Sequence, residues 1–400
     1  MERDELAGWL RLTLTPSIGD ITARKLLAAF GLPPQVFAQP EAALQQVVSQ
    51  AQAAALRQTP SGLSSMVDET WDWLQAVEPS GVTRRLSTLA DPTYPASLLD
   101  MVDPPLMLYV IGAPQFDLTA LDRALAIVGS RNPTPQGTLN ARDFGRALGE
   151  ADITVVSGLA LGVDGAAHEG ALDAADGTGR FATIAVVGTG LDRVYPARHR
   201  DLAHRITAQG LIVSEFPLGT PPLNQNFPKR NRIIAGLTRG TLVVEAALRS
   251  GSLITARLAV EQGKEVFAIP GSIHSPQSRG GHLLIRQGAK LVESVQDILE
   301  ELRFDGAEIS SISSTSSTSS TSSTFPAAAG AAGRIDDEDG EDEPSSGLLH
   351  DLGFDPVSLD ALCARTGYSA AELQGRLLEL ELDGHVARLP GGLFQRVAVG

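Results

Sequence analysis

The chain has 400 residues, of which 43% are hydrophobic, and its formal net charge is −15. This length exceeds the roughly 250 to 300 residues that a single hydrophobic core usually reaches, which predicts two or three domains. No stretch approaches the about 18 apolar residues of a membrane span, the start MERDELAGWL lacks a signal-peptide pattern, and the single cysteine, Cys363, excludes an intramolecular disulfide. We therefore expect a cytoplasmic protein without membrane contact.

The charge is unevenly distributed along the chain. Residues 1–90 hold 7 Lys and Arg against 9 Asp and Glu, residues 91–304 hold 20 against 22, and residues 305–400 hold 5 against 16. Within the middle part, residues 191–257 hold ten basic against four acidic side chains, so a positive local field survives in an acidic protein. Such a segment either binds a polyanion or forms a basic surface without a ligand, and charge alone leaves both open.

Residues 1–85 have the apolar spacing of helices and no convincing strand. The segment TPSIGDITARKLLAAFG (15–31) is typical of one hairpin of a helix-hairpin-helix or SAM-like domain. In such a hairpin Gly19 would allow a tight turn, and free amides at the start of the next helix could meet a phosphate. A purely structural helical domain is the alternative.

Residues 86–304 are expected to form an extended Rossmann-like domain. Short apolar, β-branched runs alternate there with helical patterns: ALAIVG (124–129), ITVVSG (153–158), ATIAVVG (182–188), LIVSEF (211–216), TLVVEA (241–246) and EVFAIP (265–270). Strands that are buried on both faces have this pattern. Their alternation with helices predicts right-handed crossovers and a parallel, doubly wound sheet, so the expected fold class is α/β.

Small, polar or basic residues follow several of these strands, at the edge where ligands bind in open α/β sheets. The candidates after the strands are Gly129, Ser130, Arg131, Ser157, Gly158, Ser250 and Gly251. The segment NFPKRNRIIAGL (226–237) adds Lys229, Arg230, Asn231 and Arg232, next to an apolar helix that we expect to begin near Arg232. Together they predict an anion-binding edge.

The edge lacks the common signatures of nucleotide enzymes. The expected G-x-G-x-x-G loop is replaced by GSRNPTPQG, and no G-x-x-x-x-G-K-[ST] loop or G-x-S-x-G elbow occurs, so we predict no cofactor and no catalytic residue. His168 follows Asp164 by one helical turn, which is compatible with a two-ligand metal face. We favour a packed histidine that is hydrogen-bonded to Asp164, because no third ligand is evident, and we predict no metal.

Six segments cover most of residues 90–292 in order: YPASLLDMVDPPLMLYVIG (94–112), AIVGSR (126–131), SGLALGVDGAAHEGAL (157–172), AVVGTGLDRVYPARH (185–199), SEFPLGTPPLNQNFPKRNRIIAGL (214–237) and VVEAALRSGSLITARLAVEQGKEVFAIPG (243–271). Together they resemble the DNA-processing protein A family, also called DprA or Smf. The resemblance implies a non-enzymatic protein that binds single-stranded DNA and helps load the RecA recombinase in natural transformation, competence and recombination. Single-strand binding protein is a further candidate partner.

The expected DNA site combines Arg131 with Lys229, Arg230 and Arg232, while Asn231 could bond a base edge or a phosphate. The alternative for each arginine of the segment is an internal ion pair with Glu215 or Glu245. Aromatic residues make up only 5% of the chain, so beyond Phe227 and Tyr195 few stacking faces are expected, and phosphate contact should exceed base stacking.

The segment HLLIRQGAKLVES (282–294) is expected to end the Rossmann-like domain with a short edge strand, and such edges tend to pair. We expect a twofold homodimer through Leu284, Ile285 and Leu291, close to where the family dimerises, as the resemblance implies. Burial of the three residues within one protomer is the alternative.

Residues 305–346, with SISSTSSTSSTSST and IDDEDGEDE, predict a disordered Ser/Thr-rich and acidic linker. Residues 347–400 predict a winged helix, whose second helix over 369–383 carries Glu372, Glu379, Glu381 and Asp383. This acidic face favours protein contact or regulation over duplex binding.

A competing hypothesis is an enzyme, a Rossmann-like nucleotide phosphoribohydrolase with Glu245 as its acid. The P-G-G-x-G-T-x-x-E loop of such enzymes is absent, since AALRSGSLITA follows Glu245.

Overall fold

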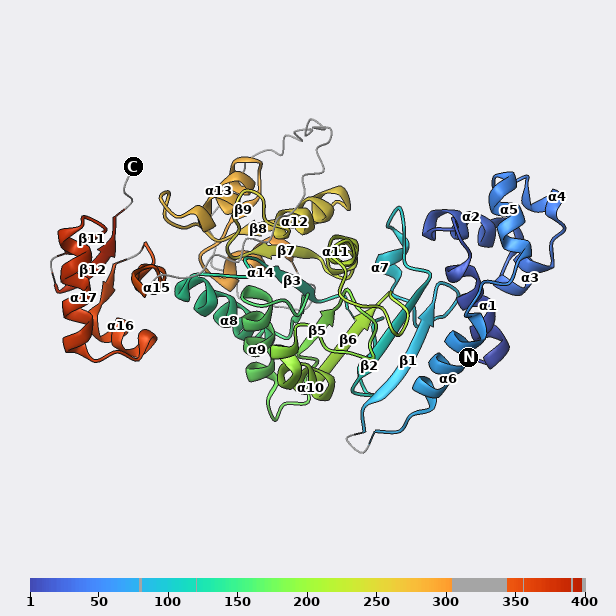
Figure 1. The fold of residues 1–400 in the computed structure, drawn as a ribbon, viewed down its shortest axis with the longest axis horizontal. Helices are drawn as coiled ribbons and strands as arrows, with labels where there is room; N and C mark the ends of the chain where they lie inside the picture. Colours follow the sequence, from blue (N-terminus) through green and yellow to red (C-terminus); the bar gives the residue numbers. More distant parts are fainter. Residues whose placement is uncertain (79–80, 120, 304–343, 355, 390, 398–400) are drawn as a thin grey trace.

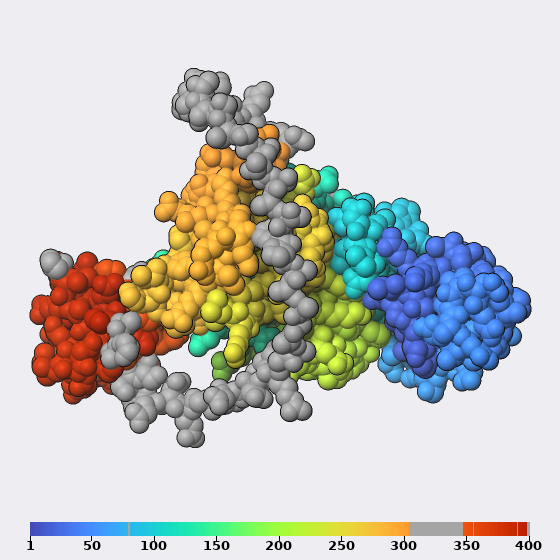
Figure 2. Space-filling model, turned by 90° about the horizontal axis from the view of Figure 1, so that it is seen from above, coloured from blue at the N-terminus to red at the C-terminus, as the bar shows by residue number. Residues whose placement is uncertain are grey.

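The structure is a computed structural model that describes residues 1–78, 81–119, 121–303, 344–354, 356–389 and 391–397. Three parts follow one another along the longest axis of the molecule: a helical part at the N-terminus, a central sheet with its helices, and a small C-terminal part (Figure 1). The view from above shows the same order, from blue through yellow and orange to red (Figure 2). Residues 305–343 of the expected linker lie outside the described residues.

The N-terminal part is helical, as its apolar spacing predicts. Its helices are α1 (Arg3–Leu14), α2 (Asp20–Phe30), α3 (Pro33–Ala38), α4 (Glu41–Leu44), α5 (Gln50–Arg57) and α6 (Leu63–Gln75). They enclose a core of their own around Trp9, Leu10 and Leu26, and Met107 joins this core from the neighbouring strand β2 (Met107–Gly112). The helical part is therefore packed directly against the edge of the central sheet.

The central part is built on one nine-stranded sheet with the order β1-β2-β6-β5-β4-β3-β7-β8-β9. The strands besides β2 are β1 (Thr83–Thr88), β3 (Ala124–Val128), β4 (Thr154–Ser157), β5 (Thr183–Val186), β6 (Gly210–Ser214), β7 (Gly240–Val243), β8 (Glu265–Ala268) and β9 (Lys290–Leu291). In this spatial order, all neighbouring strands from β6 through β5, β4, β3, β7 and β8 to β9 are parallel. The pairs β1–β2 and β2–β6 are antiparallel. The six predicted strands are β3 to β8, and the antiparallel pair β1–β2 is an addition.

Helices cover both faces of this sheet (Figure 1). They are α7 (Ala96–Leu99), α8 (Pro135–Glu150), α9 (Val163–Ala175), α10 (Arg200–Gln209), α11 (Asn226–Gly236), α12 (Ser252–Glu261), α13 (Arg279–Arg286) and α14 (Val295–Leu302). Along β3, Ala126 and Val128 join one hydrophobic core while Leu125 and Ile127 join another on the opposite face. This two-sided burial explains why the central strands are continuous apolar runs in the sequence.

The C-terminal part has the winged-helix order of elements. It consists of α15 (Pro344–Leu352), β10 (Val357–Ser358), α16 (Leu359–Thr366), α17 (Ala370–Leu382), β11 (Val386–Leu389) and β12 (Leu393–Arg396), with a small antiparallel sheet β10-β12-β11. Ser369 and Glu372 form a capping box at the start of α17, which fixes its first turn. The α/β class, with a mostly parallel sheet and a C-terminal winged helix, is confirmed. In the described part of the chain, no helix is both long and apolar enough to span a membrane.

Candidate nucleic-acid interface

The loops after the parallel strands bring Arg131 and the first turn of α11 to the same edge of the sheet. Helix α11 begins at Asn226, six residues before the expected start near Arg232. Pro228 is compatible with this earlier start because the first helical turn needs no internal N–H donor. Phe227 and Lys229 therefore lie in the first turn, where the helix meets the loops.

Aromatic rings lie next to cations at this edge. The guanidinium carbon of Arg131 lies 5.3 Å from the ring centre of Phe227, and the ring centres of Phe227 and Tyr195 are 5.7 Å apart. The Nζ of Lys229 lies 5.6 Å from the ring centre of Phe216, which directly follows Glu215 at the end of β6. Arg131, Tyr195 and Lys229 are exposed, and Phe216 and Phe227 are half-buried, so this set, here called the cation–aromatic row, is open to solvent.

Arg230 does not belong to this open row, which corrects the expected site. Its side chain is buried, its Nη1 donates to the carbonyl oxygen of Val186 at 2.6 Å, and its Nε donates to Oδ1 of Asn231 at 2.9 Å. Burial lowers the pKa of Arg230, and the nearby carboxylate of Asp164 opposes this shift. Arg230 and Asn231 therefore belong to the packed floor beneath the row.

Gly158 makes room for this buried arginine. A Cβ at position 158 would lie 1.7 Å from Nη1 of Arg230, so any other residue there would displace the guanidinium group. The amide of Gly158 donates to Oδ2 of Asp164 at 3.1 Å. Gly158 is therefore buried in the packed floor beneath the row, where it leaves space for the guanidinium group of Arg230.

Arg232 is held by three carboxylates and is also unavailable to a ligand. Its Nη2 contacts Glu215 and lies 3.2 Å from Oδ2 of Asp20, and its Nε lies 3.2 Å from Oδ2 of Asp103. The side chain is only 6% exposed. The internal ion pair with Glu215, which the sequence left open, is the arrangement in the structure, together with partners from residues 20 and 103 that the sequence did not indicate.

The remaining small and polar candidates mostly support the loops from below. Ser157 is fully buried and donates to the carbonyl oxygen of Ile127 at 2.6 Å. A Cβ at Gly129 would lie 2.7 Å from the side chain of Val163, and Ser130 is buried, accepting from the amide of Asn132 at 3.1 Å. Near α12, Ser250 is half-buried and Gly251 is exposed, so these two are the accessible members of the group.

The pair Asp164 and His168 is structural, but the expected bond between them is wrong. Nδ1 of His168 lies 2.7 Å from Oγ1 of Thr183, and that hydroxyl donates its only proton to the carbonyl oxygen of Val155 at 2.6 Å. His168 must therefore be the donor at Nδ1, which leaves Nε2 unprotonated and without a hydrogen-bond partner. Burial, with smaller contributions from His199 and Arg230, lowers the pKa of His168 to about 3.

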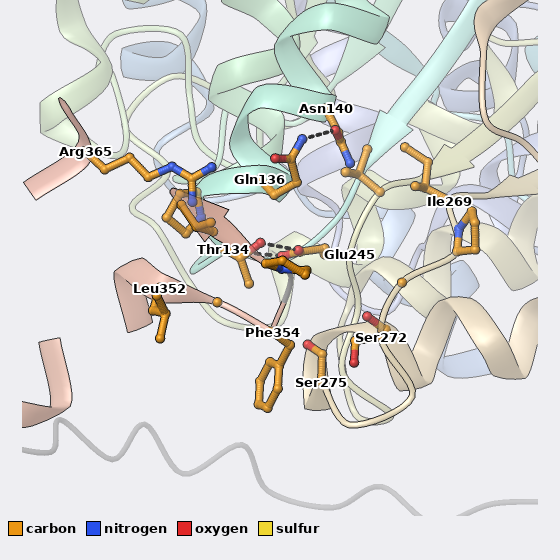
Figure 3. Close-up of a pocket in the computed structure, with 18 of the residues that line it drawn as sticks. Thr134, Gln136, Asn140, Glu245, Ile269, Ser272, Ser275, Leu352, Phe354 and Arg365 are labelled. Atoms are coloured by element: carbon orange, nitrogen blue, oxygen red, sulfur yellow. Dashed lines mark hydrogen bonds between the residues drawn. The ribbon is translucent and has the colours of Figure 1, made fainter. Parts of the chain in front are cut away.

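Glu245, the acid that the enzyme hypothesis would use, caps the start of α8. The backbone amide of Thr134 donates to Oε2 of Glu245 at 2.9 Å, and its hydroxyl donates to Oε1 at 2.6 Å (Figure 3). The same hydroxyl accepts from the amide of Gly137. These bonds satisfy donors at the helix N-terminus, which is a structural task.

The winged helix closes a cavity beside this cap. The cavity measures about 210 Å³, and Leu352, Phe354 and Arg365 line it from the C-terminal part (Figure 3). Ser272 and Ser275 also line it, from the loop after β8. The winged helix thus lies next to the edge of the sheet that carries Thr134, three residues after Arg131.

The three residues of the expected dimer interface differ in exposure. Leu284 is 9% exposed and belongs to a hydrophobic core, and Ile285 is half-buried against the same core. Leu291, on the edge strand β9, is 44% exposed. Only Leu291 offers a substantial surface to a second copy.

The sequence missed Phe216 as a stacking candidate, although its place directly after the strand run LIVSEF was a usable signal. No group of three or more His, Cys, Asp or Glu side chains suited to a metal ion occurs within the described ranges. The surface chemistry of the edge is thus that of exposed cations next to aromatic rings, which suits anionic, planar groups.

Comparison with known proteins agrees with these features. Residues 85–303 match the family model described as DNA recombination-mediator protein A, and residues 332–392 match that of the DprA winged helix domain. The chain is 43% identical to Protein Smf of Escherichia coli over 75% of this chain and 74% of that protein.

It is also 46% identical to the DNA processing protein DprA of Streptococcus pneumoniae, over 54% of this chain and 74% of that protein. The X-ray structure of the Streptococcus pneumoniae DprA superimposes with a TM-score of 0.61 at 34% identity, covering 75% of this chain and 98% of that one. The chain belongs to the DNA recombination-mediator protein A family, whose members are called DprA or Smf.

Proposed function

We propose that the protein binds single-stranded DNA along the cation–aromatic row and acts without catalysis as a recombination mediator that loads RecA. The observation that carries the proposal is that two exposed cations, Arg131 and Lys229, lie next to the rings of Phe227 and Phe216 at an open edge of the sheet, with Tyr195 beside Phe227. Proteins that bind single strands without sequence preference combine cations for the phosphates with aromatic faces for the bases.

Stacking carries more of this binding than the low aromatic content suggests. Although aromatic residues make up only 5% of the chain, Phe216, Phe227 and Tyr195 all lie at this edge. Stacking on one side chain contributes about 1–3 kcal/mol per base in single-strand binding. Every base has a π-face, so the binding should be tolerant of sequence.

The electrostatic contribution rests on fewer cations than the sequence suggests. Among the described residues, no carboxylate forms an ion pair with Arg131, and its guanidinium group lies over the ring of Phe227. Lys229 is 45% exposed and lies at the surface of its ion-pair cluster. These two side chains are the proposed phosphate contacts, and Ser250 and Gly251 are proposed as accessible neighbours.

The partnership with RecA, the homodimer and a cytoplasmic location belong to the same proposal. Their support is the family membership, whose model is described as a recombination mediator. Single-strand binding protein is a further proposed partner, because it covers the same DNA. The expected domain limits, 1–85, 86–304 and 347–400, are retained as proposals for expressing the parts separately.

The test compares Arg131→Ala, Lys229→Ala and Phe227→Ala with the parent protein for binding to a fluorescent oligo-dT at several salt concentrations. Each alanine variant of a cation should weaken binding and make the salt dependence shallower by up to about 0.7 per lost contact, with the smaller change for Lys229, which is paired with carboxylates. Phe227→Ala should weaken binding about fivefold or more, with little change in the salt dependence.

Arg146→Ala is the matched control, because this arginine is 55% exposed on α8 and pairs with Asp143, on the same helix. The control should bind like the parent. If all three site variants also bind like the parent while remaining folded, the proposed site is wrong.

A nucleotide phosphoribohydrolase is not favoured by the geometry, because both carboxylate oxygens of Glu245 accept bonds from Thr134. Release of free base from nucleoside monophosphates by the pure protein would nevertheless contradict the non-enzymatic proposal.

A further inference from the structure

Lys229, the proposed phosphate contact on α11, is already held by two carboxylates from distant parts of the chain. Its Nζ lies 3.3 Å from Oδ2 of Asp20 and 3.3 Å from Oε2 of Glu215. Asp20 is the first residue of α2, in the N-terminal helical part, whereas Glu215 follows β6. An acid of the helical part therefore reaches into the proposed DNA site.

The same carboxylate of Asp20 bridges two cations. Its Oδ2 lies 3.2 Å from Nη2 of Arg232 as well as 3.3 Å from Nζ of Lys229. With Glu215 and Asp103, the cluster contains three carboxylates and two cations, so the positive charge of Lys229 is compensated before any ligand arrives.

The members of the cluster differ in their access to solvent. The side chains of Glu215 and Arg232 are 4% and 6% exposed, that of Asp20 is 18% exposed, and that of Lys229 is 45% exposed. An anion from solution can thus approach Lys229 but not Arg232. On approach it comes close to Asp20, which repels it.

We propose that Asp20 is a positioning residue through which the N-terminal helical part restrains Lys229 and weakens single-stranded DNA binding, with a DNA phosphate replacing Asp20 as the partner of Lys229. The inference rests on the proposed function of the edge. An ammonium group has only three donors, and two carboxylates already lie near this one. The affinity for the strand is therefore the outcome of a competition between Asp20 and the DNA phosphate.

The competition also couples the DNA site to the helical part. If the strand weakens the contact of Asp20 with Lys229, then release of that contact must strengthen strand binding by the same factor, because binding free energies are linked reciprocally. Bound oligonucleotide should therefore increase amide hydrogen exchange in α2 from Ala23 onward, where the amide of Ala23 donates to the carbonyl oxygen of Gly19. This measurement uses the unmodified full chain.

A purely structural role for Asp20 is the competing explanation. A carboxylate in the first turn of a helix is stabilising by itself, through the dipole and the free amides of that turn. In that case removal of the charge would lower the stability of the helical part without a specific effect on the strand. The two explanations differ in what they require of Lys229.

The decisive variant is Asp20→Asn, which removes the charge and keeps the size of the side chain. We expect it to bind oligo-dT about threefold to tenfold more tightly than the parent at low salt, because Lys229 is 45% exposed and its Coulomb interaction with Asp20 lies near the bulk-water limit. The salt dependence should become steeper by up to about 0.7, since Lys229 then contributes a full phosphate contact. Asp20→Glu should bind like the parent.

Asp103→Asn is the matched control, because Asp103 contacts Arg232, with no ion pair to Lys229 recorded among the described residues. It removes a negative charge from the same cluster and should change the affinity less than about twofold. In the Lys229→Ala background, Asp20→Asn should have no further effect. Equal tightening in both backgrounds, or no tightening in the parent background, overturns the inference.

The outcomes separate this inference from the proposed function. If Arg131→Ala and Lys229→Ala bind like the parent, the DNA site itself is misplaced. If they weaken binding while Asp20→Asn does not tighten it, only the role of Asp20 is wrong. If Asp20→Asn does not fold, unchanged hydrogen exchange of α2 on addition of oligo-dT to the parent is the overturning result.

Discussion

Single residues at the carboxyl edge divide into a buried floor and an open surface, although their types are the same. Arg131 and Arg230 both follow from the sequence as candidate cations, yet only Arg131 is exposed. The buried position of Arg230 depends on the space that Gly158 leaves and on the carbonyl oxygen of Val186, which accepts its hydrogen bond. The sequence predicts the presence of cations, whereas their exposure depends on contacts with residues far along the chain.

The partners of Arg232 also lie far from it in the sequence. Its contact with Asp20 joins residues that are 212 positions apart. The pairing with Glu215, 17 positions away, was among the alternatives that the sequence offered, because Glu215 follows a predicted strand and Arg232 lies in the next segment of the chain. The pairing with Asp20 depends on how the helical part packs on the sheet, which no local pattern encodes.

His168 gives a prediction for acid stability. Its pKa is lowered from 6.5 to about 3. As the pH falls, the unfolded chain therefore binds a proton at His168 near pH 6.5, whereas the folded protein binds it only near pH 3. The stability that depends on neutral His168 is therefore complete above about pH 6.5 and is lost as the pH falls toward 3. In this window the free energy of unfolding should fall by about 1.4 kcal/mol per pH unit on account of this group.

His168→Asn removes the titrating group and can still donate to Thr183 through its amide. The variant should show a smaller loss of stability between about pH 6 and about pH 4 than the parent, measured by urea unfolding with circular dichroism. His204→Asn, which removes an exposed imidazole, is the control. Identical pH dependence in the parent and in His168→Asn would refute the assignment.

At the scale of elements, the buried parallel strands were the most predictable feature. Strands β3 to β8 are apolar runs because both of their faces are covered, so each strand carries its own signal. Strand β1 was missed because its sequence TRRLST is largely half-buried and contains two arginines. It is stabilised by pairing with β2, a contact that becomes visible only in the folded sheet.

The start of α11 was misplaced for a related reason. The polar residues Lys229, Arg230 and Asn231 suggest a loop before the apolar part of the segment, but the helix begins at Asn226. Arg230 and Asn231 are buried by the floor of the site, so their polarity reflects internal hydrogen bonds and not exposure to solvent. The location of the DNA site at this edge therefore stays a proposal, and of the expected cations Arg230 and Arg232 do not face outward.

Strand β9 gives a prediction for assembly at the element scale. It lies at the end of the sheet order, and Leu291 on it is 44% exposed. We expect this edge to form a twofold homodimer, because an unpaired strand edge with an exposed apolar residue tends to pair. Leu291→Glu should shift the protein toward the monomer in light scattering, by at least tenfold in the dissociation constant.

Leu284 and Ile285 are unsuitable for this test, because their side chains pack in the core of the same protomer and a charge there would destabilise the fold. Leu139→Glu, which places the same charge on an apolar side chain of α8 that is 47% exposed, is the control. An unchanged mass for Leu291→Glu would contradict a dimer through β9.

At the scale of the whole molecule, charge is separated between the parts. Residues 305–400 hold 16 acidic against 5 basic side chains, whereas residues 91–304 are close to neutral. In the winged helix, α17 exposes Leu378 and Leu382 beside Glu379 and Glu381, which is an unfavourable surface for the phosphates of a duplex. The C-terminal part is therefore expected to contribute little to the affinity for DNA.

Deletion of residues 305–400 should accordingly leave the affinity for oligo-dT nearly intact or tighten it slightly. The acidic tail competes with DNA for the cations of the edge, but the Debye length of about 8 Å at physiological salt screens each contact, so the gain should be less than about threefold. The winged helix also lines the cavity beside Thr134, so its removal opens the neighbourhood of Arg131 without removing any member of the cation–aromatic row. The comparison of the full chain with residues 1–304 at two salt concentrations checks this expectation, and the gain should shrink at the higher one. If the truncated protein instead loses about tenfold or more in affinity for oligo-dT, the winged helix itself binds the DNA. The acidic face of α17 would then have to point away from the DNA.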